Sequence, residues 1–264
     1  MLRTELKDGI LLVGLDRPDK RNALSDPLVR ELEQMFRDPP AAARVAVLYG
    51  NGEHFCAGLD LSELRERDAS QGLAHSRFWH EAMHRIELGR IPVVAALHGA
   101  VVGGGLELAT ACHLRVADES AFFALPEGAR GIFVGGGGSV RISRLIGAAR
   151  MLDLMLTGRV LSAAEAEPIG LVHYRVGAGQ ALNRAIELAH RIADNAPLTN
   201  YALMHALPRI AEQPADHGLL TEALMSAIAQ SAPEAKARLH AFLDGRADKV
   251  ARPHRPSKET SSEA

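Results

Sequence analysis

The chain has 264 residues, of which 47% are hydrophobic and 23% are charged, and its formal net charge is -2. This length allows one large domain with a sizeable core, and the charge favours neither nucleic acid nor an anionic membrane as a partner. Two cysteines are too few for a disulfide framework, which predicts a cytoplasmic protein. The first ten residues do not match a secretory signal, and the apolar run 91–112 contains a proline, four glycines and a glutamate, which excludes a typical membrane span.

Strands and helices alternate through the first two-thirds of the chain. Residue patterning predicts strands at 2–6, 10–15, 45–49, 91–97, 113–117 and 121–123, and helices at 26–36, 72–88 and 106–112. Ser25 or Asp26 is expected to cap the first helix. From about residue 137 the pattern is mainly helical, with one strand expected at 171–174.

This alternation predicts an α/β core followed by a helical C-terminal part. We expect a core over residues 1–195, a helical oligomerisation region over 196–245 and a flexible tail over 246–264. Leu220, Leu224 and Ile228 repeat at helical spacing, so their helix is expected to pack against the core or another subunit.

The segment from His80 to His84 matches the zinc-protease pattern H-E-x-x-H, which places two imidazoles on one helix face. The third ligand that such enzymes need does not follow in the sequence. The chain has 12 histidines, so an incidental match is easy, and we predict no metal.

Glycine runs at 103–105 and 135–138 suggest loops that lead into helices. A dinucleotide fingerprint fails because Leu108 occupies its third glycine position, and neither a P-loop ending nor a G-x-S-x-G elbow occurs. A glycine loop at a helix start nevertheless offers free N–H groups to a developing oxyanion.

Two glutamates lie in apolar surroundings, Glu107 in GGGLELATA and Glu127 after AFFALP. Burial of a carboxylate is costly unless the group is paired or used, and it raises the pKa toward the range of acid–base catalysis. The alternative is that both glutamates form ordinary salt bridges.

Four segments in order resemble the crotonase (enoyl-CoA hydratase/isomerase) superfamily, over residues 10–245. They are RPDKRNALSDPL, HFCAGLDLSEL, IPVVAALHGAVVGGGLELATACHLRVA and the segment from ALPEGARGIFVGGGG to GLVHY. The resemblance implies a spiral of β-β-α units with a helical C-terminal region, and a homotrimer or dimer of trimers. It implies an acyl-CoA substrate and no bound cofactor.

The resemblance also assigns catalytic roles. The backbone N–H groups of Leu59 and Gly104 would hold the thioester oxygen as it becomes an enolate, and a Cβ at Gly104 is expected to crowd that thioester. Glu107 would be the base on the attacking water, and Glu127 would exchange a proton at C2. Retention of both glutamates favours a hydratase over an isomerase.

Further residues would bind coenzyme A by the same resemblance. The charged side chains of Lys20 and Arg21 are expected at its phosphates, with a solvated turn as the alternative. The residues expected near the adenine and pantetheine, largely through backbone atoms, are Asn22, Ala23, Leu24, Ala57 and Asp60.

The sequence departs from the family pattern at Arg130, where an aliphatic residue is usual, and at Val134, where a proline is usual. These differences affect the expected acyl group more than the fold. The function predicted is addition of water to a 2-enoyl-CoA. The alternatives are an enoyl-CoA isomerase, another crotonase acting on a non-fatty acyl-CoA, and a non-catalytic binding protein of this fold.

Overall fold

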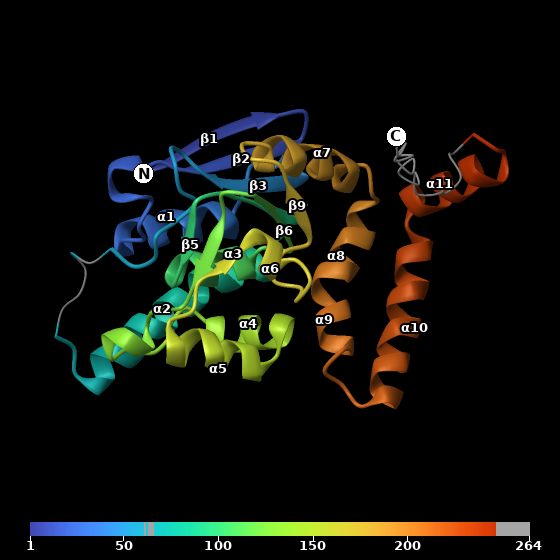
Figure 1. Ribbon diagram of the computed structural model, residues 1–264. Helices are drawn as coiled ribbons and strands as arrows, with labels where there is room; N and C mark the ends of the chain where they lie inside the picture. Colours follow the sequence, from blue (N-terminus) through green and yellow to red (C-terminus); the bar gives the residue numbers. More distant parts are fainter. Residues whose placement is uncertain (61, 63–65, 247–264) are drawn as a thin grey trace, which may run out of the picture.

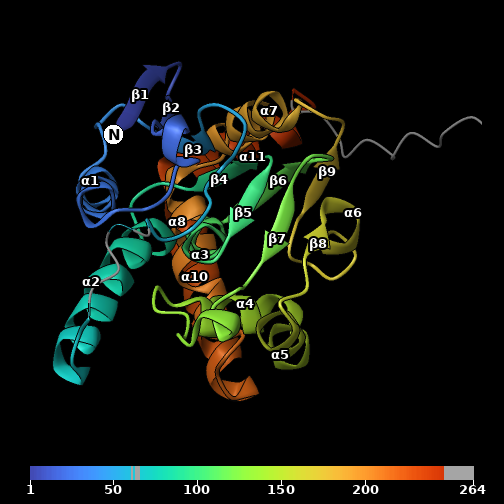
Figure 2. The same cartoon turned by 60° about the vertical axis from the view of Figure 1, so that its left-hand side comes forward.

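The computed structural model describes residues 1–60, 62 and 66–246. One sheet has six strands in the order β1-β2-β3-β4-β6-β9, and a second has three in the order β5-β7-β8 (Figures 1 and 2). Strand β1 is antiparallel to β2, and the rest of the large sheet is parallel. The strands are β1 Leu2–Lys7, β2 Ile10–Leu15, β3 Val45–Gly50, β4 Val93–Leu97, β5 Ala100–Val102, β6 Leu114–Asp118, β7 Phe122–Ala124, β8 Leu161–Ser162 and β9 Tyr174–Val176.

Successive strands pass from the large sheet to the small one and then into a helix. Strands β4 and β5 lead into α3, and β6 and β7 lead toward α4; a bridge between Cys56 and Val101 extends the small sheet after β3. This arrangement confirms the expected spiral of β-β-α units. The helices are α1 Asp26–Arg37, α2 Ala69–Glu87, α3 Gly104–Ala111, α4 Gly138–Ile146, α5 Ala148–Thr157, α6 Ala163–Ala166, α7 Ala181–Ala193, α8 Pro197–His205, α9 Leu207–Ile210, α10 Ala215–Ser231 and α11 Pro233–Leu243.

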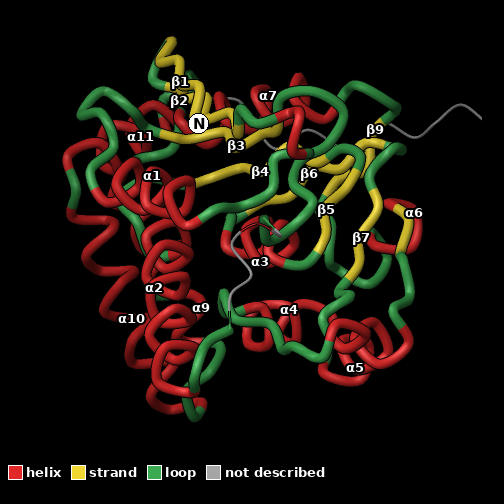
Figure 3. Tube along the Cα trace, turned by 90° about the vertical axis from the view of Figure 1, so that its left-hand side faces the viewer, coloured by secondary structure: helices red, strands yellow, loops and turns green. Residues whose placement is uncertain are grey.

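The two faces of the large sheet carry separate cores, because alternate residues of a strand point to opposite faces. Val45 and Val47 pack with the apolar face of α7, whereas Ala46 and Leu48 pack with α1, α2 and α3. Figures 1 and 3 show α7 over one side of this sheet, with α3 and α4 on the other side. The N-terminus of α3 therefore lies inside the molecule, beside α2.

Most expected elements are confirmed, including the cap of α1, where the Ser25 hydroxyl accepts from the Leu28 N–H at 3.4 Å. Strands β5 and β8 were not predicted, because their three and two residues are too short to show a period. The strand expected near 171–174 is present but lies later in the chain: β9 begins at Tyr174, where pairing with β6 starts. Leu171 and Val172 are buried outside any strand, and two consecutive apolar residues give this segment the sequence pattern of a buried strand.

Helices α8 to α11 follow a turn after α7 and stand beside the core (Figure 1). Leu219, Leu220 and Leu224 of α10 are each more than half exposed. The expected boundary at residue 195 falls between α7 and α8, and the division into two parts remains a prediction. Most of the expected tail, 247–264, lies outside the described residues. Among those described, no helix has the length and apolar character needed to cross a membrane.

Candidate active site

A cavity of about 460 Å³ lies between α2, the start of α3 and the segment 130–136. Its wall contains all four residues predicted as catalytic, namely Leu59, Gly104, Glu107 and Glu127. These come from stretches of the chain up to 68 positions apart (59 to 127), and the fold brings them to one place. The cavity therefore joins the two predicted N–H donors to the two predicted carboxylates.

Backbone pairing places the donor at Leu59. The Leu24 N–H donates to Gly58 O at 2.7 Å, and the Asp60 N–H donates to Leu24 O at 2.8 Å. Gly58 has φ +99°, and a Cβ on it would lie 2.8 Å from Val102 O, so glycine permits the close approach of this loop to the strand that leads to Gly104.

The backbone N–H groups of Leu59 and Gly104 have no acceptor within the part of the chain that the structure describes. Gly104 is the first residue of α3, where an N–H has no partner inside the helix. Two unpaired donors on one cavity wall can hold an oxygen on which negative charge develops.

Packing behind the donor is a further reason for glycine at position 104. A Cβ there would lie 3.0 Å from Cζ3 of Trp79 and 3.6 Å from a methyl group of Leu24. A Cβ would thus meet the buried side chains behind the donor, because the glycine Hα that it would replace faces α2. The crowding expected at the thioester remains a prediction. A larger residue would displace the Gly104 N–H by pressing on Trp79.

Glu107 projects from α3 and is 3% exposed. Its Oε1 accepts from the Gly136 N–H and the Gly138 N–H, both at 2.8 Å, so it lies at the N-terminus of α4. Burial raises the pKa of this carboxyl to about 7, although these two N–H groups oppose the rise, and the charge of Glu127 adds to it. A carboxyl with a pKa near 7 is matched to general acid–base catalysis at neutral pH.

Glu127 is also buried, and its Oε2 has no hydrogen-bond partner among the described residues. Gly103, at φ +53°, lies against it: a Cβ on Gly103 would be 2.7 Å from Glu127 Oε1. Burial raises the pKa of Glu127, and the nearby Arg130 acts in the opposite direction. An unpaired buried carboxyl oxygen is costly, so its place at the cavity wall favours a role toward a ligand or water.

The raised pKa of Glu107 predicts a pH-dependent stability cost. Between pH 4.5 and about 7 the folded chain holds a proton at Glu107 that the unfolded chain releases, so stability falls as pH rises through this window. Above it the cost is on the order of 3 kcal/mol. Glu107→Gln removes this titration. We therefore expect the free energy of unfolding of the variant, relative to that of the wild type, to be higher at pH 8.5 than at pH 5. Urea unfolding of both proteins at the two pH values measures the difference; parallel pH dependences would contradict it.

The side chains of two predicted coenzyme A residues have structural partners. Asn22 is fully buried and donates to Asn51 O at 2.8 Å and to His54 O at 2.7 Å. Asp60 accepts from Arg17 at 2.7 Å and from Ser62, and these contacts lower its pKa to about 2. Both side chains hold the loops in place, so Asn22 and Asp60 would contact coenzyme A through their backbone atoms.

The remaining predicted coenzyme A residues lie on the same two loops. The Ala57 N–H donates to Arg21 O at 3.0 Å, which joins the loops, and Ala57 lines the cavity. Ala23 and Leu24 are buried, whereas Lys20 and Arg21 are exposed. Arg21 and Asn22 have left-handed backbone conformations at φ 50° and 55°. Their binding roles remain predictions.

Sequence reasoning missed the contribution of α2 to the cavity. His75, Ser76 and Trp79 line it, and the Trp79 indole N–H donates to Asp26 at 3.3 Å. The signal was present as the spacing of Trp79, Met83 and Ile86, which marks the buried face of this helix. Ile132 and Phe133 also line the cavity and are exposed at its edge.

The two histidines of the H-E-x-x-H match lie in a different pocket. His80 contacts the Ser76 hydroxyl at 3.3 Å, and His84 lines the same second pocket. Among the described residues, no group of three or more histidine, cysteine, aspartate or glutamate side chains is arranged to hold a metal. The expected absence of a metal remains a prediction, and a metal analysis of the purified protein tests it.

Comparison with known proteins identifies the family. Residues 5–250 match the model of the enoyl-CoA hydratase/isomerase family. The chain belongs to this family. A short-chain-enoyl-CoA hydratase of Clostridium acetobutylicum is 33% identical over 91% of this chain and 94% of that protein. The 2,3-dehydroadipyl-CoA hydratase of Escherichia coli is 34% identical over 90% and 93%, respectively.

Solved structures of the enoyl-CoA hydratase/isomerase family share the fold. A crystal structure from Rhodopseudomonas palustris, described as that of a candidate enoyl-CoA hydratase, is 57% identical with a TM-score of 0.91, over 93% of this chain and 95% of that one. The enoyl-CoA hydratase of Bacillus anthracis is 33% identical with a TM-score of 0.86, over 93% and 96%. The crotonase fold expected from the sequence is therefore confirmed.

Proposed function

We propose that this protein is an enoyl-CoA hydratase, a hydro-lyase that adds water across the double bond of a 2-enoyl-CoA. The observation that carries the proposal is one cavity that combines two unpaired backbone donors with two buried glutamates. The donors supply a site for the thioester oxygen, and the carboxyl groups supply a site for water. The hydratase names of the relatives support the same reaction.

In the proposed reaction, the Leu59 and Gly104 N–H groups hold the thioester oxygen. Glu107 removes a proton from water as its oxygen bonds to C3, and the electron pair of the double bond moves to form the enolate. Glu127 delivers a proton to C2 as the carbonyl re-forms. Both carboxyl groups then exchange protons back to their starting states, so the sum is one water added.

The coenzyme A portion is proposed to lie along the joined loops 20–24 and 57–60. Exposed Lys20 and Arg21 suit the phosphates, since both side chains are free to turn toward an anion at the loop surface. Ala57 at the cavity wall suits the pantetheine. No cofactor is needed in this scheme, because coenzyme A arrives as part of the substrate.

A panel of 2-enoyl- and 3-enoyl-CoA thioesters tests the assignment. We expect 2-enoyl thioesters to lose their conjugated-enoyl absorbance and to gain the mass of one water. A 3-enoyl thioester that gains conjugated absorbance at unchanged mass would identify an isomerase instead. No change in any thioester would favour a non-catalytic protein of this fold.

We also propose a trimer or dimer of trimers that uses the C-terminal helices. Leu220, Leu224 and Ile228 are 62%, 57% and 46% exposed and repeat along α10, so they form an apolar stripe that the described chain leaves uncovered. A solution mass of one chain at micromolar concentration would contradict this assembly. The cytoplasmic location expected from the two cysteines remains a prediction.

A further inference from the structure

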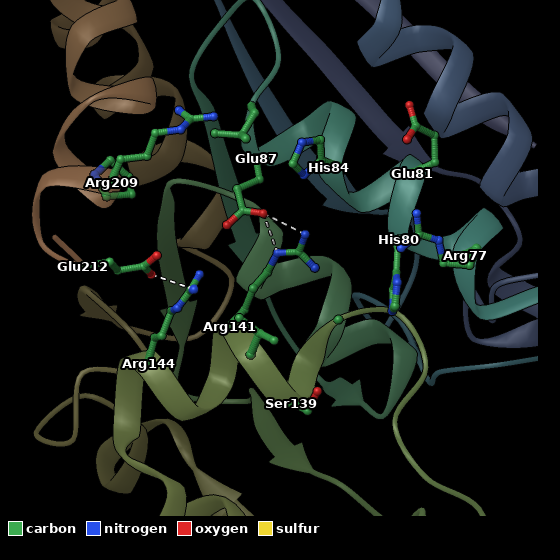
Figure 4. Close-up of a pocket in the computed structure, with 14 residues that line it drawn as sticks. Arg77, His80, Glu81, His84, Glu87, Ser139, Arg141, Arg144, Arg209 and Glu212 are labelled. Carbon is green, nitrogen blue, oxygen red and sulfur yellow. Dashed lines mark hydrogen bonds and ion pairs between the residues drawn. The ribbon is translucent and has the colours of Figure 1, made fainter. Parts of the chain in front are cut away.

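A second pocket, of about 530 Å³, lies behind the glycine turn 135–138 (Figure 4). Gly137 and Ser139 line this pocket, whereas Gly135 and Gly136 line the candidate active site, so the turn borders both. Its wall is rich in charged side chains from α2, α4 and the residues around α9. The contacts within this pocket indicate what holds the turn in place.

Arg141 of α4 is the most enclosed charged group in this wall, with a side chain 10% exposed. Its Nε and Nη2 donate to Glu87 Oε2 at 2.8 and 2.7 Å (Figure 4). Its Nη1 donates to Gly136 O at 3.0 Å. A Cβ on Gly137 would strike Nη1, which shows how closely the guanidinium packs on the turn. Arg141 thus links the turn to the end of α2.

Glu87 is itself fixed to the large sheet. The Nδ1 of His113 accepts from the Val93 N–H at 2.9 Å, so its Nε2 carries the proton and donates to Glu87 O at 3.1 Å. Burial lowers the pKa of His113 to about 4, which keeps the ring in this neutral form near neutral pH. The main chain of Glu87, whose carboxylate holds Arg141, is therefore fixed in place by His113.

The other side of the turn holds the carboxylate proposed as the base. The Gly136 N–H and Gly138 N–H both donate to Glu107 Oε1, and a Cβ on Gly138 would lie 2.8 Å from Glu107 Cγ. A shift of this turn would therefore change both the direction and the number of hydrogen bonds to Glu107. Misplacement of a catalytic group by about 1 Å can cost 10²-fold in rate.

We infer that Arg141, held by Glu87, is a positioning residue that fixes the glycine turn in the shape whose N–H groups orient Glu107 for attack on the substrate. This inference rests on the proposed function. Ser76 supports the same turn by donating to Gly135 O at 2.7 Å, in the peptide that carries the Gly136 N–H, whereas Arg141 holds the next peptide of the turn through Gly136 O.

The charged and titratable groups around Glu107 give this inference a pH signature. Glu127 lines the same cavity, Arg141 holds the turn from α4, and His80 and Glu87 of α2 line the second pocket with Gly137 of the turn. Arg141 and the two N–H groups lower the pKa of Glu107. Their loss would raise the pKa further, so the acid limb of the kcat profile would move to higher pH.

The test compares Arg141→Met with Arg144→Met. Arg144 is on the same helix, is 55% exposed and pairs with Glu212 at 2.6 Å, so it is a matched control that does not contact the turn. We expect Arg141→Met to lower kcat about 10–100-fold with KM changed less than about 3-fold, and to move the acid limb upward. Glu87→Gln should also lower kcat. The fold loss of kcat in the double variant, Arg141→Met with Glu87→Gln, should be smaller than the product of the two single losses.

Arg141→Lys keeps the charge but cannot contact Glu87 and Gly136 together, so it should recover only part of the rate. It also serves if Arg141→Met does not fold. A titration followed by ¹³C NMR measures the pKa of the Glu107 carboxyl directly and needs no turnover. The Glu107 signal is assigned as the one that is missing in Glu107→Gln. Loss of the Arg141 charge alone would move the midpoint in Arg141→Met, so Arg141→Lys, which keeps the charge, is the deciding variant, and an unmoved midpoint there would overturn the inference. If the wild type hydrates no enoyl thioester, the proposed function fails, and the titration of Arg141→Lys still decides whether Arg141 positions Glu107.

Discussion

We expect Glu107→Gln to lower kcat about 10²–10⁴-fold, the usual contribution of a positioned acid or base. Gln keeps the size of the side chain and one oxygen to accept from Gly136 and Gly138, but it cannot take a proton from water. KM should change much less, because coenzyme A is proposed to bind to other segments of the chain. Steady-state kinetics on a 2-enoyl-CoA measures both constants.

The matched control is Glu81→Gln, which makes the same change at an exposed glutamate of α2 that pairs with Arg85. It should keep nearly full activity. Glu127→Gln should lose activity over a similar range to Glu107→Gln, and the double variant should lose less than the product, because both groups act on one water. Full activity of Glu107→Gln beside an inactive Glu127→Gln would indicate an isomerase, which needs only one proton shuttle.

The second large effect is expected at the oxyanion site. Gly104→Val would press its side chain on Trp79, which lies 3.0 Å from the position of a Cβ, and so displace the Gly104 N–H. Loss of one such donor costs about 10²–10³-fold in kcat. Gly104→Ala should show a smaller loss in the same direction. Initial rates at saturating substrate, with circular dichroism to check folding, give the result.

A compensating variant separates displacement of the donor from general damage. Trp79→Phe removes the outer ring atoms Cζ3 and Cη2 that the new Cβ would meet. The combination of Gly104→Ala with Trp79→Phe should therefore recover rate relative to Gly104→Ala alone. Near-normal turnover by Gly104→Val would mean that the thioester oxygen lies elsewhere.

Part of the predicted catalytic set has a local signature in the sequence, whereas Leu59 was assigned by the family resemblance alone. Glu107 stands out as a charge within an apolar helix, and the glycines at 103–105 mark a close backbone approach. The larger strands follow from apolar runs bounded by turn residues. The resemblance then orders these features into one fold, and the structure places Leu59, Gly104, Glu107 and Glu127 around one cavity.

Other features depend on contacts that no local pattern contains. The side of Gly104 that faces Trp79 is set by the packing of α2 on α3, so this reason for the glycine could not be predicted from the sequence. Arg141 looks like a surface residue of an amphipathic helix, yet its guanidinium is nearly enclosed by Glu87 and the glycine turn. Strand β8 has only two residues and exists through its pairing with β7.

The most direct test is turnover of a 2-enoyl-CoA in ¹⁸O-labelled water by the wild type and by Glu107→Gln. Hydration predicts that the wild type forms a 3-hydroxyacyl-CoA that carries one labelled oxygen and that the conjugated absorbance falls in step. Glu107→Gln should form this product about 10²–10⁴-fold more slowly. A product of unchanged mass with a moved double bond, or labelled product formed at the full rate by Glu107→Gln, would contradict the account.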